Sequence, residues 1–406
     1  MNPRKKRRLV LIGIFGFAAL GLSAWWFWRV PAGPGSEDVE AEPPDRPTAL
    51  TLAFGRKIAA QLDLGAGTQG HKVLWAGNDV WVFATVGYEK VVSLRWQGSE
   101  WSEPEAVSSS DWSHVDNVNA AMDPAGRPVV FWTGFLGGPG EKLGCAHWTP
   151  DGWQPKGPLA GKLYFSEIAS CVDRNGNVHV AYDGPLTPRE RYSLGIVVVD
   201  GAYADKCHHL VFDGQRWTPP RATTGRGRFS VKDLHLSTGP TGTVYLSATL
   251  SPFDRISYGK SYLAYQTWDG TQWSGFRRVT PKGVDVEEGR LVVDAWGTKH
   301  VWWQTEICPS YAMLRNGTTS VPRPVSGWHV SQSVVADGAG RAVICWGDGL
   351  RIWNGRQWSD PLAPVSGQLD ATAGGATFLT WQDANRIVLQ EVVVRPRPRG
   401  RDGGSK

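Results

Sequence analysis

The 406-residue sequence lacks the local motifs on which many catalytic and cofactor sites depend. It contains no Gly-rich phosphate-binding loop, no zinc-ligand spacing and no nucleophile elbow. The run Cys207-His208-His209 holds metal-binding residue types, but adjacent residues on a strand point to opposite faces. We therefore expect no cofactor and no metal.

The sequence is also poor in cysteine and in net charge. Five cysteines permit at most two internal disulfides and leave one over, and several stand in strand-like runs such as Val343-Ile344-Cys345-Trp346. A buried thiol that acts as a small hydrophobe is expected there. The net charge is +5, and much of the excess lies in residues 4–8 and 395–401. A chain with a nearly neutral body is not expected to bind nucleic acid.

The N-terminus carries a long apolar run. Residues 9–28 contain no charge and follow the basic run of residues 4–8. As a helix they would be about 30 Å long, enough to cross a bilayer core, with Trp25, Trp26 and Trp28 at the far interface. A cleaved secretory signal is the alternative, but bulky aromatics replace the small residues of a cleavage site. No cysteine follows the run, so a lipoprotein anchor is not indicated.

These features divide the chain into five segments. Residues 1–8 are predicted to be a cytoplasmic basic segment and residues 9–28 a single transmembrane anchor. Residues 29–49, rich in proline and acidic residues, are predicted to be an extended linker. Residues 50–394 would form the folded part outside the cytoplasm, in the periplasm or at the cell surface, and residues 395–406 a disordered basic tail.

A tryptophan-flanked turn recurs through the folded part. Its clearest copy is Trp268-Asp269-Gly270-Thr271-Gln272-Trp273. Related copies begin at Trp96, Trp148, Phe212 and Trp353. Asp-Gly and Asn-Gly pairs favour a type I′ hairpin turn, and the flanking tryptophans supply apolar surface that should be consumed in packing between sheets.

A second recurring phrase, Asp-x-x-Gly followed by a strand of β-branched and aromatic residues, sets the period. Four copies have the marker glycines Gly126, Gly176, Gly297 and Gly340. Three weaker copies keep only the glycine before the strand, and their markers are Gly77, Gly242 and Gly375. Two strands around each of the two turns give four strands per unit. The sequence therefore predicts an all-β fold, a β-propeller of about seven four-stranded blades. A strand within residues 50–62 would complete the last blade and remove the open sheet edges.

The tryptophan turn resembles the Asp-box of sialidase-like (BNR-repeat) propellers. The Gly-to-Trp spacing matches at Gly98/Trp101, Gly214/Trp217, Gly270/Trp273 and Gly355/Trp358. The resemblance covers about residues 50–394 and implies the propeller fold. The Phe/Tyr-Arg-Ile-Pro segment, which supplies the first arginine of the family's carboxylate-binding triad, has no counterpart here. The repeated turns also look like those of some propeller lectins.

Two groups of residues are candidates for a binding site on the face opposite the short turns. Long loops on that face are expected to present function. The loop candidates are Arg191, Tyr192, Arg255, Tyr258 and Tyr311. The first residues of the inner strands should converge on the central channel, and these candidates are Asp116, Asn117, Glu167, Asp233, Glu288 and Arg290. Polar side chains in a wet channel need no ligand, and that interpretation stays open.

The leading hypothesis is that this face binds a glycan, a cell-envelope polymer or a protein partner. The alternative is a sialidase-like glycoside hydrolase, which needs two carboxylates across a bond, one with a raised pKa. Its candidate catalytic residues are Glu167, Glu288, Asp233 and Tyr192. A structural scaffold is the third hypothesis. Binding leads because the family's first-arginine segment is missing.

Overall fold

The structure is a computed structural model of the chain. It describes residues 50–61, 70–76, 79–137, 140–163, 167–184, 206–223, 229–252, 260–315, 318–320, 323–324, 334–336, 340–346, 349–362, 368–371, 377–383 and 386–396. All of them belong to one unit, Glu40–Lys406. The predicted cytoplasmic segment, anchor and linker lie outside these ranges. Within the ranges, no helix is long and apolar enough to cross a membrane.

The described strands form seven antiparallel sheets. The first sheet consists of β2 (His71–Ala76), β3 (Asp79–Val86), β4 (Lys90–Trp96) and β5 (Glu105–Ala106). The second consists of β6 (Trp112–Met122), β7 (Pro128–Leu136), β8 (Glu141–Thr149) and β9 (Gly152–Leu163). The third consists of β10 (Ile168–Val172), β11 (Val178–Gly184), β12 (Lys206–Phe212) and β13 (Arg221–Ala222).

The remaining sheets follow the same order along the chain. The fourth consists of β14 (Phe229–Thr238), β15 (Val244–Pro252), β16 (Tyr262–Trp268) and β17 (Arg277–Arg278). The fifth consists of β18 (Glu288–Val293), β19 (Lys299–Gln304), β20 (Ser310–Arg315), β21 (Thr318–Thr319) and β22 (Arg323–Pro324). The sixth consists of β23 (Val334–Ala336), β24 (Ala342–Trp346) and β25 (Gly349–Ile352). The seventh consists of β26 (Gln368–Ala371), β27 (Thr377–Asp383), β28 (Arg386–Pro396) and β1 (Leu50–Gln61).

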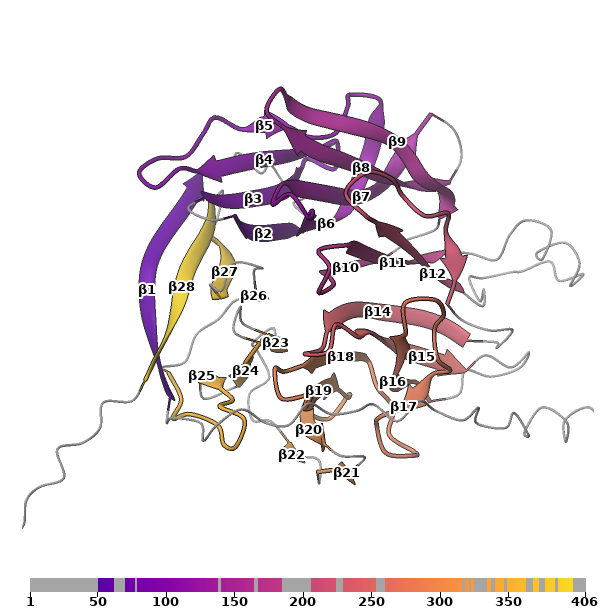
Figure 1. Cartoon of the computed structure of the whole chain (residues 1–406), viewed down its shortest axis with the longest axis vertical. Coiled ribbons are helices and arrows are strands. Elements are labelled where there is room, and N and C mark those ends of the chain that lie inside the picture. The colour runs from indigo at the N-terminus through magenta and orange to yellow at the C-terminus, as the bar shows by residue number, and fades with distance from the viewer. Residues whose placement is uncertain are drawn as a thin grey trace, which may run out of the picture. The chain divides into compact units, whose positions relative to one another are not determined.

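The first strand of each sheet lies innermost, and these inner strands form a closed cycle. In order they are β2, β6, β10, β14, β18, β23 and β26, and each contacts the next, with β26 contacting β2 (Figure 1). Sheets that succeed one another around a common centre in this way are arranged like the blades of a β-propeller. The predicted all-β fold is confirmed.

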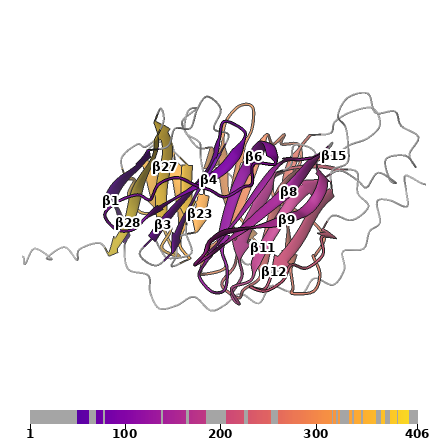
Figure 2. The same ribbon diagram turned by 90° about the horizontal axis from the view of Figure 1, so that it is seen from above.

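The last sheet joins the two ends of the folded part. Strand β1 pairs antiparallel with β28, from Leu50 opposite Pro396 to Gln61 opposite Arg386. The indigo β1 and the yellow β28 lie side by side in both views (Figure 1 and Figure 2). The predicted completion of the last sheet by a strand within residues 50–62 is therefore confirmed. Pairing between the ends covers edges that would otherwise be exposed.

The tryptophan-flanked turns close outer hairpins and pack against the preceding sheet. Trp268 pairs with Trp273, and both rings lie about 5 Å from the ring of His209 in the third sheet (5.0 and 4.9 Å). The tryptophans are thus consumed in packing between sheets, as predicted. The type I′ assignment is wrong for this turn, because Gly270 has a positive φ of 99° while Asp269 does not. The Asp269 side chain instead accepts hydrogen bonds from the backbone N–H groups of Thr271 and Gln272.

Two of the marker glycines, Gly340 and Gly242, lie where successive repeat units approach closely. Gly340 has a φ of 71°, and a Cβ built on it would lie 2.8 Å from Ala295 Cβ in the preceding sheet. Gly242 has a φ of 86°, and its Cβ would lie 3.0 Å from Arg174 Cβ. Both the left-handed backbone and the close approach exclude a larger residue at these positions.

Candidate functional site

The inner strands end at the Asp-x-x-Gly turns, and we call this the turn end. In the third sheet, Asp173 Oδ1 accepts hydrogen bonds from the backbone N–H groups of Asn175 (2.8 Å) and Asn177 (2.9 Å). Asp173 Oδ2 accepts from Asn177 Nδ2 (2.9 Å) and lies 3.2 Å from His179 Nε2. Burial alone would raise the pKa of Asp173, but the hydrogen bonds from Asn177 and His179 outweigh it and lower the pKa.

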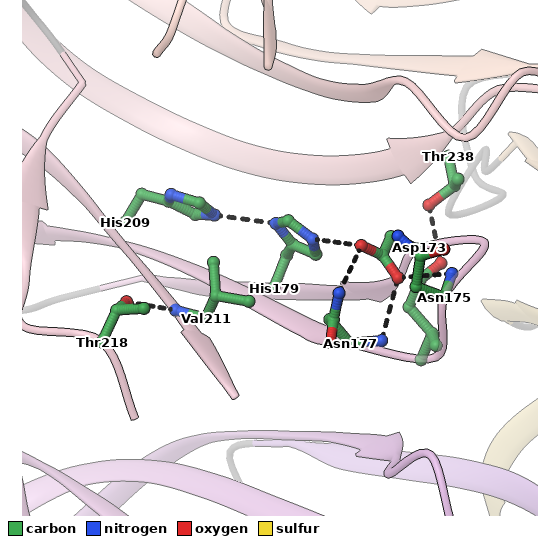
Figure 3. A network of polar contacts seen from close by, with 9 residues as sticks. Asp173, Asn175, Asn177, His179, His209, Val211, Thr218 and Thr238 are labelled. Atoms are coloured by element: carbon green, nitrogen blue, oxygen red, sulfur yellow. Dashed lines mark hydrogen bonds and ion pairs between the residues drawn. The ribbon is translucent and has the colours of Figure 1, made fainter. Parts of the chain in front are cut away.

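The network continues from this turn into the sheet (Figure 3). His179 Nδ1 lies 2.9 Å from His209 Nε2. Because His179 donates from Nε2 to Asp173, its Nδ1 accepts, and His209 must donate from Nε2. Burial, with His179 and then Arg221, lowers the pKa of His209 to about 3. The pair is therefore neutral at physiological pH.

The fifth sheet repeats this arrangement with a tyrosine. Asp294 Oδ1 accepts from the backbone N–H groups of Trp296 (2.9 Å) and Thr298 (2.8 Å), and Oδ2 lies 2.9 Å from His300 Nε2. His300 Nδ1 lies 2.6 Å from the hydroxyl of Tyr311. Tyr311 is 3% exposed, so the prediction that it belongs to a loop that presents a site is wrong.

Sequence analysis missed these Asp–His pairs as a group. Both follow the pattern Asp, five residues, His, and the pattern is visible in the sequence at Asp173/His179 and Asp294/His300. The Asp-x-x-Gly phrase was interpreted as a turn and the histidine as one residue of a strand. At the turn end the carboxylates are fully engaged by the protein, which favours a structural role.

The opposite end of the inner strands carries a different set of carboxyl groups. Glu167, Asp233 and Glu288 each stand nine positions before the marker glycine of their own unit. They therefore occupy equivalent places in the repeat, at the start of β10 and β18 and at the register shift within β14. We call this set the acidic end. After burial, the charges of Glu167 and Glu288 raise the pKa of Asp233, and the charge of Glu288 adds to the raised pKa of Glu167.

Glu167 holds the backbone of the neighbouring sheet. Its Oε2 accepts a hydrogen bond from the N–H of Leu234 at 2.9 Å, across from the third sheet to the fourth. Burial raises the pKa of Glu167, and the backbone N–H groups of Leu234 and Asp233 offset part of that effect. Its own N–H donates to Asp183 Oδ1. The Glu167 side chain thus positions the backbone of β14 at Leu234, in the middle of that strand.

Asp233 occupies a strained backbone position and carries an unsatisfied oxygen. It lies where the β14–β15 register shifts between Lys232 and His235, with a φ of 55°. Its Oδ2 is buried and makes no hydrogen bond with any described residue. Burial, and then the charge of Glu167, raise its pKa to about 7. An unpaired buried acceptor costs free energy unless a ligand or water supplies a donor.

Thr249 adds a second unsatisfied polar atom beside Asp233. It stands opposite Lys232 in the strand register and is 0% exposed. Its hydroxyl faces the Asp233 carboxyl, and this interaction lowers the pKa of Asp233 against the larger effects of burial and of Glu167. The Oγ1 does not reach ideal hydrogen-bond geometry with any described residue. Sequence analysis did not single out Thr249, because a threonine in a strand carries no distinctive signal.

The other predicted residues of the inner strands are placed as follows. Arg290 pairs with Glu288 at 3.3 Å, with both side chains partly exposed. Asp116 and Asn117 start from the equivalent bulge in β6, and Asn117 has a φ of 48°. Burial raises the pKa of Asp116, and His114 partly offsets it. The structure thus brings Glu167, Asp233, Glu288 and Arg290 into one electrostatic group, whereas the resolved influence on Asp116 comes from His114.

The loop candidates lie outside the described residues. They are Arg191, Tyr192, Arg255 and Tyr258.

A cavity of about 470 Å³ lies among the inner strands and is distinct from the acidic end. Its walls come from β2, β6, β10, β14, β18 and β23, and include Lys72, Ser170, His235 and Thr238. Burial, and then Arg290 and Lys72, lower the pKa of His235 to about 3. Glu167, Asp233 and Glu288 do not line this cavity. The cavity is therefore separate from the acidic end and contributes no acid or base to it.

No protein-family model and no curated protein matches the chain. Its fold is similar to that of BP39L lectin from Burkholderia pseudomallei, at a TM-score of 0.52 and 13% identity over 86% of this chain and 97% of that one. An α-L-arabinanase from Penicillium chrysogenum gives 0.50 and 11% over 84% and 98%. The polysaccharide lyase Uly1 gives 0.52 and 10% over 80% and 90%. At such identities the similarity shows the fold alone, and it does not single out the sialidase-like family.

Proposed function

We propose that the protein is a membrane-anchored, extracytoplasmic seven-bladed β-propeller that binds a glycan at its acidic end. Residues 9–28 would be the anchor, with residues 1–8 in the cytoplasm and the propeller in the periplasm or at the cell surface. The observation that carries the proposal is Asp233 Oδ2, a buried acceptor without a partner among the described residues. A sugar hydroxyl would supply the missing donor.

The character of the described surface supports a polar ligand. Among the described residues, Ile307 is the one exposed large hydrophobic side chain. Protein-docking surfaces are usually marked by contiguous apolar patches, which this part of the chain does not present. Two proteins of similar fold, a lectin and an arabinanase in complex with arabinobiose, agree with a glycan ligand. Arg191, Tyr192, Arg255 and Tyr258 would extend the site from the loops.

The second candidate function is glycoside hydrolysis. It is favoured by the difference between Asp233, whose pKa is raised to about 7, and Glu288, which pairs with Arg290. A carboxyl group protonated near neutral pH can serve as general acid, while an ion-paired carboxylate can act as base or nucleophile. Glu167 is the weakest of the predicted catalytic residues, because its carboxylate already accepts a backbone hydrogen bond.

A glycan array and a panel of fluorogenic glycosides, both on the full-length protein, test the two functions. Asp233→Asn and Glu288→Gln are compared with Asp151→Asn, an exposed carboxylate in an outer turn. Binding without turnover, lost in the first two variants and kept in the third, supports the binding function. Turnover by the unchanged protein that is lost in the first two variants would instead support glycoside hydrolysis. No binding and no turnover would leave the structural scaffold.

A further inference from the structure

The cavity among the inner strands has the size and the mixed walls of a small-molecule site. Its volume is about 470 Å³, and such sites commonly measure about 300–1,000 Å³. Apolar side chains from five sheets line it beside polar ones, and they include Leu74, Met122, Val172, Val292 and Val335. Walls of this kind suit a molecule that carries both C–H surface and polar groups.

His235, which lines the cavity, keeps a hydrogen-bond acceptor without a protein partner. Its Nδ1 lies 3.1 Å from the backbone oxygen of Leu291 in the fifth sheet. A carbonyl oxygen only accepts, so Nδ1 carries a proton, and Nε2 of the neutral ring keeps its lone pair. Burial, and then Arg290 and Lys72, lower the pKa of His235 to about 3, so the ring is neutral at physiological pH. Within the described part of the chain, Nε2 makes no hydrogen bond. A ligand hydroxyl can therefore donate to it.

Two hydroxyl groups on the same wall also present acceptors. Ser170 Oγ donates to Asn119 Oδ1 at 2.8 Å, and Thr238 Oγ1 donates to the backbone oxygen of Val172 at 2.8 Å. A hydroxyl has one proton, so each of these oxygens can only accept from a ligand. Ser170, Thr238 and His235 are all partly exposed. The ligand that suits them is one with several hydrogen-bond donors.

The charged side chains on the wall balance one another. Among the described residues that line the cavity, Lys72 and Asp294 are the charged ones. Asp294 accepts hydrogen bonds from the protein with both carboxylate oxygens. With one charge of each sign on the wall, an ionic ligand of either sign would lie near a like charge, which costs free energy. The donors of the ligand should therefore be hydroxyl groups and not ammonium groups.

We infer that the cavity is a second binding site, which takes a neutral polyhydroxylated molecule of monosaccharide size. One hydroxyl of the ligand would donate to His235 Nε2, and others would donate to Ser170 and Thr238. Its C–H surface would cover the apolar walls and displace water from them. No carboxyl group of the acidic end lines the cavity. The inference therefore goes beyond the proposed function and stands or falls separately from it.

Ligand-observed NMR on the full-length protein tests the inference. Glucose, galactose, mannose and sorbitol are the neutral probes, and glucosamine and glucuronate are the charged ones. We expect a neutral probe to bind about tenfold more tightly than either charged probe, because the charges on the wall cancel. Tighter binding of a charged probe, or no binding of any neutral probe, would overturn the inference.

Two substitutions of His235 separate binding from packing. In His235→Asn the amide nitrogen can replace Nδ1 as the donor to Leu291, while Nε2 is removed. In His235→Gln the longer side chain brings its amide oxygen near the place of Nε2, while the donor at Nδ1 is lost. We expect His235→Asn to weaken binding about tenfold with little loss of stability, and His235→Gln to keep binding and lower the midpoint of thermal unfolding. The reverse pattern would overturn the inference.

His114→Asn is the matched control, because His114 is exposed, does not line the cavity and has a φ of 45° that asparagine tolerates. It should leave binding unchanged. Ala336→Leu adds volume to the wall of the cavity and removes no side-chain hydrogen bond, so it should abolish binding. Unchanged binding in Ala336→Leu would overturn the inference. Circular dichroism of each variant shows that a loss of binding is not a loss of fold.

The same titrations distinguish this cavity from the acidic end. A sugar whose binding is lost in Asp233→Asn and kept in His235→Asn would lie at the acidic end. That result would overturn the inference and leave the proposed function in place.

Discussion

At the turn end of the inner strands, Asp173 and Asp294 accept hydrogen bonds from the protein with both carboxylate oxygens. By contrast, Asp233 of the acidic end and Asp116 of β6 each keep a buried oxygen that makes no hydrogen bond with a described residue. All four residues are aspartates, and they lie in or next to equivalent inner strands. The protein lowers the pKa of Asp173 and raises that of Asp233. The first arrangement stabilises the fold, and the second retains capacity for a ligand.

The largest expected effect comes from Asp294→Ala at the turn end. The substitution leaves the backbone N–H groups of Trp296 and Thr298 and the His300 ring without their acceptor. We expect a loss of about 3 kcal/mol or more in the free energy of unfolding, since the Thr298 N–H and the His300 ring are buried donors and the Trp296 N–H is partly buried. Urea denaturation measures it, with Asp269→Ala as control, an exposed residue with a similar side-chain cap. Equal losses in the two variants would contradict the buried network.

Tyr311→Phe breaks the same network at its far end. His300 Nδ1 would lose the hydroxyl that donates to it, in a fully buried position. We expect a loss of about 1–2 kcal/mol in stability and no change in ligand binding. Tyr262→Phe is the matched control, because its ring keeps its contact with the Arg278 guanidinium, 4.5 Å away. Weaker ligand binding in Tyr311→Phe would restore Tyr311 as a site residue.

Asp233→Asn should act in the opposite direction on stability. The folded-state pKa of Asp233, about 7, lies above its unfolded value, so ionisation penalises the fold, and stability falls as the pH rises from about 4 to 7. The variant removes this penalty. We expect a gain of about 1 kcal/mol at pH 8 and little change at pH 4, because the carboxyl is then protonated. Asparagine tolerates the positive φ of 55°. Thermal unfolding at both pH values measures it; a loss of stability at pH 8 would show that Asp233 supports the fold.

The smallest effect is expected from Arg216→Ala, on an outer turn away from both ends. Its guanidinium lies 3.6 Å from Asp213, and both side chains are largely exposed. Solvent screens such a pair, so the midpoint of thermal unfolding should not change measurably. A clear fall in that midpoint would mean that exposed turns contribute to stability as buried ones do.

Much of the fold could be predicted from the sequence because its repeats are local. An Asp-x-x-Gly turn and a tryptophan-flanked turn each lie within a few residues, so their positions gave the number of sheets and the strand order. The pairing of β1 with β28 followed from an incomplete last unit. The turn type could not be predicted so well, because the Asp269 side chain accepts hydrogen bonds from Thr271 and Gln272 in addition to the backbone bond from Asp269 N–H to Gln272 C=O.

The site could be predicted in part only. Counting back from the marker glycines places Glu167, Asp233 and Glu288 at equivalent positions, and the charges of Glu167 and Glu288 add to the effect of burial in raising the pKa of Asp233. The separate roles of these residues depend on contacts between sheets. Glu167 is engaged by Leu234, 67 positions further along the chain, while Asp233 is left with an unsatisfied oxygen. Tyr311 was predicted to lie in a loop, but strand β20 already begins at Ser310 and includes Tyr311.

The sequence by itself therefore determined the all-β architecture, its period and the positions at which acidic residues recur, since these depend on turn geometry and strand alternation over short distances. Tertiary structure alone decided which carboxylates are satisfied and which are not. That outcome depends on burial and on donors that come from neighbouring sheets, as with Leu234 for Glu167 and His300 for Asp294. A repeated sequence can place the same residue at both ends of a strand, and only its surroundings make one structural and leave the other available to a ligand.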